Sequence, residues 1–224
     1  MSKILTVFGA TGNQGGSVIK AVLADPVLSK EYKIRAITRD ASKPAAQALA
    51  AKGVEVVSVR LYLLLRKKQM TNIIQADMSS KASVAPAVQG AHTVYLVTNF
   101  WESMSANKEI AQGKAVTDAS KAAGVQRIIF SSLINVTEAS GGKLSHVSHF
   151  DGKANIEKYI RDSGVPAAFV LPGFFMSNLI NFIKKNEDGS YTYALPVSGD
   201  KARVPIFDAA GDTGQYNTMF PKLI

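Results

Sequence analysis

Two side chains that could take part in proton chemistry lie in the short stretch HFDGK, residues 149–153. His149 and Lys153 are four residues apart, so on a helix they share one face, about one turn from each other. An imidazolium has a pKa that suits a general acid near neutral pH. No other residue in the sequence is evidently placed to tune this histidine. The pair is therefore a candidate site for proton transfer, and its function depends on which residues the other helices and strands place beside it.

A glycine-rich loop, GATGNQG, occupies residues 9–15, between the apolar run Lys3–Phe8 and a helical pattern that begins at Asn13. The first glycine permits a tight turn, the second lets a pyrophosphate approach the backbone, and the third allows close helix–strand packing. Phosphates would accept hydrogen bonds from the unpaired N–H groups at the helix start. A glycine turn without a ligand is the alternative. We expect the following residues to bind a dinucleotide: Gly9, Thr11, Gly12, Asn13, Gln14 and Gly15.

The residues after a second apolar run, Tyr32–Thr38, indicate which dinucleotide is preferred. An acid here would bind the adenosine 2′-hydroxyl of NAD, whereas arginine would pair with the 2′-phosphate of NADP. Arg39 occupies the nearer position, and Lys43 can add positive charge. Because Asp40 is an acid, binding of NAD remains an alternative, and Arg39 could instead be a solvated charge at the strand end. The pattern favours NADP over NAD.

Polar residues also follow the later apolar runs, where parallel strands would present them to a ligand. They are Asp77, Thr98, Asn99, Ser131 and Ser132. Asp77 follows the third run once an inserted stretch is set aside, a position typical of adenine contact. Each residue alone is more often a cap or a turn, but their shared location favours binding. Trp101, the only tryptophan, is expected to pack against the cofactor or to cap the core.

Short apolar runs alternate with helical patterns along the chain. Strands are predicted at Lys3–Phe8, Tyr32–Thr38, Gly53–Val57, Thr93–Asn99, Arg127–Ser132 and Ala167–Gly173. Helices are predicted at Asn13–Leu23, Lys43–Lys52, Ser103–Ala123 and His149–Asp162. This alternation predicts an α/β fold whose parallel sheet is covered by helices on both faces. Because crossovers are almost always right-handed, a doubly wound Rossmann fold follows.

Two regions depart from this alternation of strands and helices. Residues Ser58–Ile74 separate the third apolar run from Asp77, and they join an apolar cluster to Arg66, Lys67 and Lys68. An extra amphipathic helix, a gene-model artefact and a genuine insertion for membrane or partner contact are all open. Near the C-terminus, VPIFDAAGDTGQY begins another strand–helix unit with little chain after it. We expect a Rossmann domain over residues 1–175 and an incomplete C-terminal subdomain over 176–224.

The bulk composition excludes several classes of protein. There is no cysteine, so disulfides and thiolate metal sites are excluded, and the three histidines show no metal-ligand spacing. The formal net charge is +9, but it is not concentrated in basic runs with interleaved aromatics, so direct nucleic-acid binding is not expected. No apolar run reaches the roughly 20 residues of a membrane span. We expect a soluble cytoplasmic protein, with nuclear placement left open.

The sequence resembles the NmrA-like family, an atypical branch of the short-chain dehydrogenases/reductases. The resemblance covers most of residues 3–57 and 75–216. It is carried by GATGNQGGSV, ITRD, VTNFWES, HFDGK, SGVPAAFVLPGFFMSN and the closing DTGQY. It is strongest with members that bind NADP(H) as redox sensors, and the fungal namesake regulates nitrogen-metabolite genes by contacting a transcription factor. The resemblance implies that Lys153 contacts the nicotinamide ribose, with Phe174 and Asn178 at the nicotinamide end of the pocket.

HFDGK departs from the superfamily's reductases, in which a tyrosine donates the proton and a lysine one turn later lowers its pKa. None of the seven tyrosines here has a lysine four residues after it, and histidine occupies that position before Lys153. A cofactor-binding remnant is favoured over a His149-assisted reductase or a purely structural helix.

The leading hypothesis for function is an NADP(H)-binding regulator that senses redox state. It would act through a protein partner, such as a transcription factor or signalling enzyme, without standard dehydrogenase turnover. The alternatives are an atypical NADPH-dependent reductase of quinones or related carbonyl compounds, and an inactive fragment from a faulty gene model.

Overall fold

The computed structural model describes residues 2–58, 78, 80–194, 197–198 and 200–219. Its centre is a six-stranded sheet in the order β3-β2-β1-β4-β5-β6, with every neighbouring pair parallel. The strands are β1 (Lys3–Val7), β2 (Tyr32–Thr38), β3 (Glu55–Ser58), β4 (Thr93–Leu96), β5 (Arg127–Ser131) and β6 (Ala167–Val170). The order reverses between β1 and β4, which opens a crevice at the carboxyl ends of the strands. The predicted doubly wound α/β fold is confirmed.

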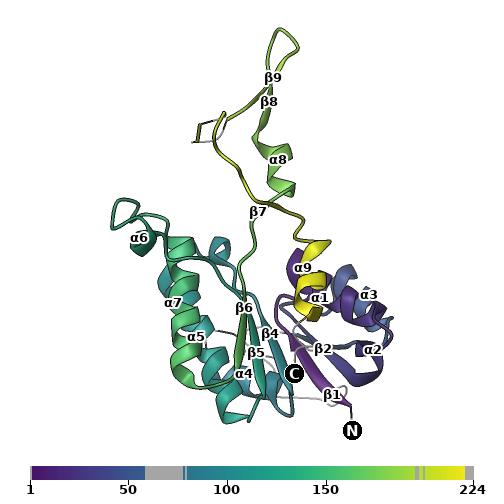
Figure 1. Ribbon diagram of the computed structural model, residues 1–224. Coiled ribbons are helices and arrows are strands. Elements are labelled where there is room, and N and C mark those ends of the chain that lie inside the picture. The colour runs from purple at the N-terminus through teal and green to yellow at the C-terminus, as the bar shows by residue number, and fades with distance from the viewer. Residues whose placement is uncertain (1, 59–77, 79, 195–196, 199, 220–224) are drawn as a thin grey trace.

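Helices cover both faces of this sheet (Figure 1). One face carries α1 (Asn13–Ala24), α2 (Leu28–Glu31), α3 (Pro44–Ala50) and α9 (Asp212–Met219). The other face carries α4 (Lys81–Val88), α5 (Ala106–Ala122) and α7 (Ser148–Ser163). Short α6 (Val136–Ala139) precedes α7.

Each face of the sheet has its own hydrophobic core, because side chains alternate along a strand. In β1, Leu5 and Val7 join the cluster beneath α1. Thr6 lies on the opposite face and donates a hydrogen bond to the Ala87 carbonyl of α4, at 3.3 Å. In β4, Tyr95 joins the α1 side, whereas Val94 and Leu96 join the α5 side. A buried parallel sheet of this kind explains why the strands read as continuous apolar runs.

Helix α9 returns the end of the described chain to α1. Ser17 Oγ of α1 accepts a hydrogen bond from Gly214 N at 2.8 Å and donates to the Gly211 carbonyl at 3.3 Å. A side chain at residue 214 would overlap the Ser17 carbonyl, so glycine allows the two helices to approach closely.

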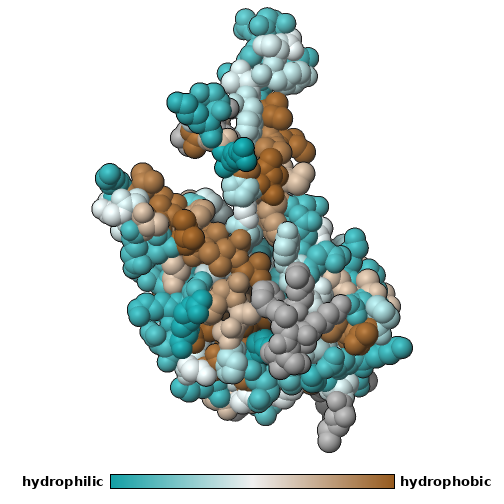
Figure 2. Space-filling model, viewed as in Figure 1, coloured by the Kyte–Doolittle hydropathy of each residue, from teal (hydrophilic) through white to brown (hydrophobic). Residues whose placement is uncertain are grey.

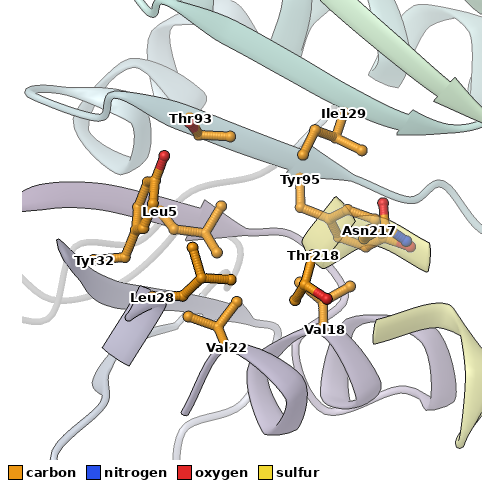
Figure 3. A pocket seen from close by; sticks show the side chains of 10 residues that line it. All are labelled: Leu5, Val18, Val22, Leu28, Tyr32, Thr93, Tyr95, Ile129, Asn217 and Thr218. Atoms are coloured by element: carbon orange, nitrogen blue, oxygen red, sulfur yellow. The ribbon is translucent and has the colours of Figure 1, made fainter. Parts of the chain in front are cut away.

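A small apolar cavity lies beneath this helix pair. Asn217 and Thr218 of α9 help to close the space, of about 20 Å³, between α1, α2 and the sheet (Figure 3). Asn217 Oδ1 is buried there and has no hydrogen-bond partner among the described residues. None of the predicted cofactor or catalytic residues lines it, so this cavity belongs to the packing of α9 and not to the candidate site.

A narrow arm projects from the sheet after β6 (Figure 1). It contains β7 (Phe174–Phe175), α8 (Ser177–Phe182), and an antiparallel hairpin of β8 (Ile183–Lys185) with β9 (Tyr191–Tyr193). The returning strand β10 (Ile206–Phe207) pairs with β7. The arm exposes apolar side chains, seen as brown atoms in Figure 2. They include Met176, Ile180, Phe182 and Ile183.

The predicted elements are present, but several strands are shorter than their apolar runs. β4 ends at Leu96 and not at Asn99, and β6 ends at Val170 and not at Gly173. The residues beyond these ends form loops over the crevice. α4 was not predicted, because it contains Pro86 and because the sequence pattern of Ser58–Ile74, shortly before it, departs from the alternation of apolar runs and helical patterns. Of the predicted insertion, only Ser58 is described, as the last residue of β3, while Asp77 lies outside the described residues.

The described residues contain neither a candidate membrane span nor a candidate metal site. None of their helices is long and apolar enough to cross a bilayer. Within the same residues, no group of three or more acidic or histidine side chains could hold a metal ion.

Candidate functional site

A large cleft of about 1660 Å³ opens at the carboxyl ends of the strands. It brings together all the predicted cofactor and catalytic residues except Asp77. They are Gly9, Thr11, Gly12, Asn13, Gln14, Gly15, Arg39, Lys43, Thr98, Asn99, His149, Lys153, Phe174 and Asn178. These residues come from the loops after β1, β2 and β4, from α7, and from the base of the arm. The order of the strands therefore brings residues that are far apart in the sequence together at one site.

The glycine loop forms a turn that leaves the start of α1 facing the cleft. Gly9 has a positive φ of 66°, and a Cβ there would lie 2.6 Å from Val97 Cγ1. Gly12 is the N-cap of α1, and no side chain caps that end. A Cβ at Gly12 would lie 3.3 Å from the Gly9 carbonyl oxygen, and one at Gly15 would overlap it. There is therefore little or no room for a side chain at these three glycines, and the N–H groups of the first turn of α1, which have no intrahelical partners, suit a pyrophosphate.

Gln14 connects this loop to the strand ends across the crevice. Its Oε1 accepts hydrogen bonds from Ser131 Oγ at 2.7 Å and from the Tyr95 hydroxyl at 3.4 Å. Burial raises the pKa of Tyr95, so its hydroxyl stays protonated and can donate. Ser131 therefore binds the loop residue, and its hydroxyl is not free for a ligand. The first turn of α1 is held against β4 and β5.

Arg39 lies at the end of β2, and its side chain is 71% exposed. Its guanidinium forms an ion pair with Glu102, with Nη1 and Oε1 3.0 Å apart. Asp40 Oδ1 accepts hydrogen bonds from Ser42 N at 2.9 Å and from Ser42 Oγ at 2.6 Å, which stabilises the turn before α3. Lys43 is the exposed N-cap of α3 and lines the cleft. All three residues line the cleft, and the two cations among them carry the charge that suits an anionic ligand.

A buried ionic network lies beneath α7. Lys153 Nζ is 2.9 Å from Glu109 Oε1, and it donates to the backbone carbonyl and to the hydroxyl of Thr98, each at 2.8 Å. The Thr98 hydroxyl in turn donates to Glu109 Oε1 at 2.7 Å. The Glu109 side chain is fully buried and that of Lys153 nearly so. Burial lowers the pKa of Lys153, and the Glu109 carboxylate partly opposes this shift.

This network occupies the donors of Lys153, the residue that the resemblance places against the nicotinamide ribose. An ammonium has three donors, and all three of Lys153 point at Thr98 and Glu109. Thr98 is buried within the network. Asn99 is exposed and caps the following 3₁₀ turn, η1 (Phe100–Glu102), by accepting from Trp101 N at 3.2 Å.

His149 lies among aromatic rings one turn before Lys153. Its ring centroid is 5.0 Å from that of Trp101, 5.7 Å from Phe100 and 4.9 Å from Phe150. Burial lowers the pKa of His149, while the Glu109 carboxylate acts in the opposite direction. The neutral imidazole is therefore favoured near pH 7. The prediction that no residue is placed to tune this histidine was wrong, because α5 brings Glu109 close to it.

Trp101 and Asp151 each take a definite place beside this histidine. Trp101 is 63% exposed and lines the cleft, so it does not cap the core. Asp151 Oδ1 accepts from Val136 N at 2.8 Å, and its Oδ2 accepts from Thr137 Oγ1 at 2.6 Å. The hydrogen bond from Thr137 Oγ1 is the largest cause that lowers the pKa of Asp151, and the backbone hydrogen bonds from Thr137 and Val136 lower it further. The acid of HFDGK therefore stabilises α6 and is not part of a proton-transfer group.

The far end of the cleft is apolar. Phe174 lies in β7 and is bound by its backbone to Pro205, with N and O 2.7 Å apart. Asn178 lies in α8, and both residues line the cleft. A Cβ at Gly173 would overlap the Pro205 carbonyl, so the backbone at Gly173 and the backbone at Pro205 are in close contact. The base of the arm is therefore fixed where it borders the cleft.

Glu109 is the site residue that the sequence analysis missed. It lies on the face of α5 that also carries Gly113, Val116 and Ser120, all of them buried. An acid on such a face of small and apolar residues signals a buried partner. That partner, Lys153, lies on α7, and only the close packing of the two helices reveals it. A Cβ on Gly113 would lie 2.5 Å from Ile156 Cγ2.

The chain is similar to several known proteins. An oxidoreductase of Penicillium ochrochloron with an NmrA-like family domain, ptmS, is 32% identical over 229 residues, which cover 95% of this chain and 62% of the relative. NmrA, a negative transcriptional regulator solved with NADP, has a TM-score of 0.75 at 24% identity, covering 99% of this chain and 62% of that one. NmrA has also been solved with NAD.

A third comparison covers less of the chain. The NADPH-dependent quinone oxidoreductase QOR2 of Escherichia coli, solved with NADPH, has a TM-score of 0.57 at 28% identity, covering 79% of this chain and 51% of that one. This chain thus spans less than two thirds of the length of each of these proteins. The NmrA-like family matches residues 1–220. The chain belongs to the NmrA-like family.

Proposed function

We propose that the cleft binds NADP(H) and that cofactor binding is itself the signal, read by a protein partner. The residues fit such a cofactor. The uncapped start of α1 would hold the pyrophosphate, and Arg39 with Lys43 would hold the 2′-phosphate. Lys153, Phe174 and Asn178 would border the nicotinamide. A bound nicotinamide could supply or accept a hydride.

One observation carries the non-catalytic part of this proposal, namely the environment of HFDGK. The position of the usual tyrosine holds His149, whose pKa is lowered by burial, so little of it is protonated at pH 7. Lys153 is bound by Thr98 and Glu109 and has no phenol to activate. The groups for standard proton transfer are therefore absent from this stretch, while the groups that grip a dinucleotide remain.

A sensor requires that the oxidised and reduced cofactors stabilise different states of the protein. The two forms differ at the nicotinamide ring, and the ring would lie beside Trp101, His149 and the base of the arm. A partner such as a transcription factor or signalling enzyme would then recognise one of the two states. NmrA, a regulator of similar fold, motivates this class of partner.

Calorimetric titration of the chain with NADP⁺, NADPH and NAD⁺ tests cofactor binding. We expect NADP⁺ to bind about tenfold more tightly than NAD⁺, which equals about 1.4 kcal/mol. The Arg39→Gln variant should lose this preference. Lys33→Gln, which removes an exposed charge from the same strand, is the matched control and should keep it. Absence of heat with all three nucleotides would contradict the proposal.

A second candidate is an atypical NADPH-dependent reductase. Two observations favour it: a relative at 32% identity is named an oxidoreductase, and the cleft that contains Lys153 is also lined by Phe150, Phe174 and Phe175. Such a region could take a quinone or a related small carbonyl compound.

Steady-state oxidation of NADPH separates the two candidates. A panel of quinones and aldehydes would be mixed with the chain and followed at the nicotinamide absorbance band. The sensor proposal expects no more than one turnover per protein molecule. Sustained turnover that is abolished in a variant with a blocked cleft, such as Gly12→Val, would favour the reductase instead.

A further inference from the structure

The ion pair between Arg39 and Glu102 spans the cofactor cleft. Arg39 follows β2, and Glu102 ends the 3₁₀ turn η1 after β4. The sheet order places β1 between β2 and β4. The pair, with Nη1 and Oε1 3.0 Å apart, therefore joins the two sides of the crevice that flank the glycine loop. Both residues line the cleft.

Glu102 is held in position by its own turn. Asn99 Oδ1 accepts a hydrogen bond from Trp101 N at 3.2 Å, and Glu102 N donates to the Asn99 carbonyl at 3.4 Å. Phe100 anchors the turn in the interior, and Trp101 lies against the His149 ring at 5.0 Å. The backbone of the turn is thus fixed, and the Glu102 carboxylate extends from it to Arg39.

The chemistry of the two dinucleotides makes this pair selective. A 2′-phosphate and a carboxylate both accept charge-assisted hydrogen bonds from a guanidinium, so they compete for Arg39. They also repel each other when both lie close to it. NAD carries a neutral hydroxyl at this position, so it leaves the ion pair with Glu102 intact.

We infer that Glu102 is a specificity-determining residue that weakens the preference for NADP by competing with its 2′-phosphate for Arg39. This inference rests on the proposed NADP(H) binding and deepens it. NADP⁺ displaces Glu102 from Arg39, whereas NAD⁺ binds with the pair in place. Because both side chains are partly exposed, the competition is modest and weakens with added salt.

The test measures dissociation constants of NADP⁺ and NAD⁺ for the full chain and for Glu102→Gln, which keeps the shape of the side chain and removes its charge. We expect Glu102→Gln to bind NADP⁺ about 3- to 10-fold more tightly, with NAD⁺ changed by less than about 2-fold. Glu187→Gln, on the exposed turn between β8 and β9, removes the same charge from a residue that does not line the cleft. It should change neither constant.

A double variant assigns the effect to Arg39. In an Arg39→Gln background, adding Glu102→Gln should produce no selective gain for NADP⁺, because the competition has lost its target. The fragments adenosine 2′,5′-bisphosphate and 5′-AMP give a second readout. The bisphosphate should change the fluorescence of Trp101, the only tryptophan, more than 5′-AMP does.

The outcomes separate this inference from the proposed function. If the unmodified chain binds neither dinucleotide, both fail. If it binds NADP⁺ but Glu102→Gln leaves both constants unchanged, or shifts both equally, the role of Glu102 is overturned and cofactor binding stands. A selective gain that persists without Arg39 would also overturn the competition.

Discussion

At the scale of single residues, the buried pair of Lys153 and Glu109 fixes the position of the lysine in the cleft. Glu109 Oε1 accepts from Thr98 and lies beside the lysine, while Oε2 is buried without a hydrogen-bond partner in the described part of the chain. A charge buried this deeply is tolerated only when an opposite charge accompanies it. The network therefore makes the position of Lys153 depend on Glu109.

Replacing Glu109 by glutamine should destabilise the protein by about 3 kcal/mol, because Lys153 then remains buried without a counter-charge. Urea unfolding at pH 7 measures the change. Glu157→Gln is the matched control: Glu157 pairs with exposed Arg161 one turn away on α7, 2.7 Å apart, and its loss should cost less than about 1 kcal/mol. Equal losses of unfolding free energy in the two variants would show that the buried pair contributes no more to stability than the exposed pair.

His149 makes stability depend on pH in a definite direction. Its pKa in the folded state is lowered from about 6.5, with burial as the largest cause. The unfolded chain therefore binds more protons below about pH 6.5, and stability falls as the pH falls through that range. Glu109 and Asp151 oppose this shift, and Lys153 adds to it.

His149→Asn should reduce this acid-side loss of stability. The slope removed is at most about 1.4 kcal/mol per pH unit for one proton. Unfolding midpoints at pH 7.5 and 5.5, compared between the variant and the parent, isolate the contribution. The pKa of His92 is also lowered by burial, so some pH dependence will remain. An unchanged difference between the two pH values would mean that His149 is protonated to the same extent in both states.

At this scale, short local patterns were enough to predict that the glycine loop and Arg39 lie at one cleft, while their roles in cofactor binding stay predictions. The part of Glu109 in the buried network and the role we propose for Glu102 could not be predicted in the same way. Each acquires its role from a residue more than 40 positions away, through the pairing of α5 with α7 or of the loops after β2 and β4. A buried acid has no local signature beyond the apolar face on which it lies.

The contact between α9 and α1 is the feature to test at the scale of elements. A Cβ on Gly214 would overlap the Ser17 carbonyl, which is backbone and cannot rotate away. We expect Gly214→Ala to destabilise the protein by about 1–3 kcal/mol, since α9 must shift. Thermal or urea unfolding followed by circular dichroism measures the loss.

Gly16→Ala is the control for that substitution. Gly16 lies in α1, and a Cβ there would be 3.5 Å from the Ala10 carbonyl oxygen, an ordinary contact. Alanine should therefore be neutral or stabilising by up to about 1 kcal/mol. If both alanine variants behaved alike, the tight approach of α9 would not be a source of stability.

Element type was easier to predict than element ends. The six apolar runs all became strands of one sheet: the central strands β4 and β5 are almost entirely buried, whereas the edge strand β6 is only partly buried. Their ends were misplaced because apolar residues such as Leu171 continue past the last ladder hydrogen bond into the cleft loops. The pairing of β7 with β10 joins residues about 30 positions apart and has no signal in either two-residue strand.

At the scale of the whole molecule, the cleft and α9 belong to one continuous unit, whereas the β8–β9 hairpin at the tip of the arm does not. The glycine loop leads into α1, and α1 is bound to α9 through Ser17. The β8–β9 hairpin is bound to itself and reaches away from the sheet (Figure 1). A ligand held at the start of α1 should therefore stabilise α9 more than the hairpin.

Hydrogen exchange with and without saturating NADP⁺ measures this difference. At a concentration 100 times the dissociation constant, binding contributes about 2.7 kcal/mol to every opening that destroys the site. Amides of α1 and α9 should slow by up to about 100-fold if they open together with the glycine loop. Those of Ile183–Lys185 should change by less than about 2-fold, which makes the hairpin an internal reference. If α9 exchanged as before while α1 slowed, the two helices would open independently, and the bond from Gly214 to Ser17 would not transmit binding across the domain.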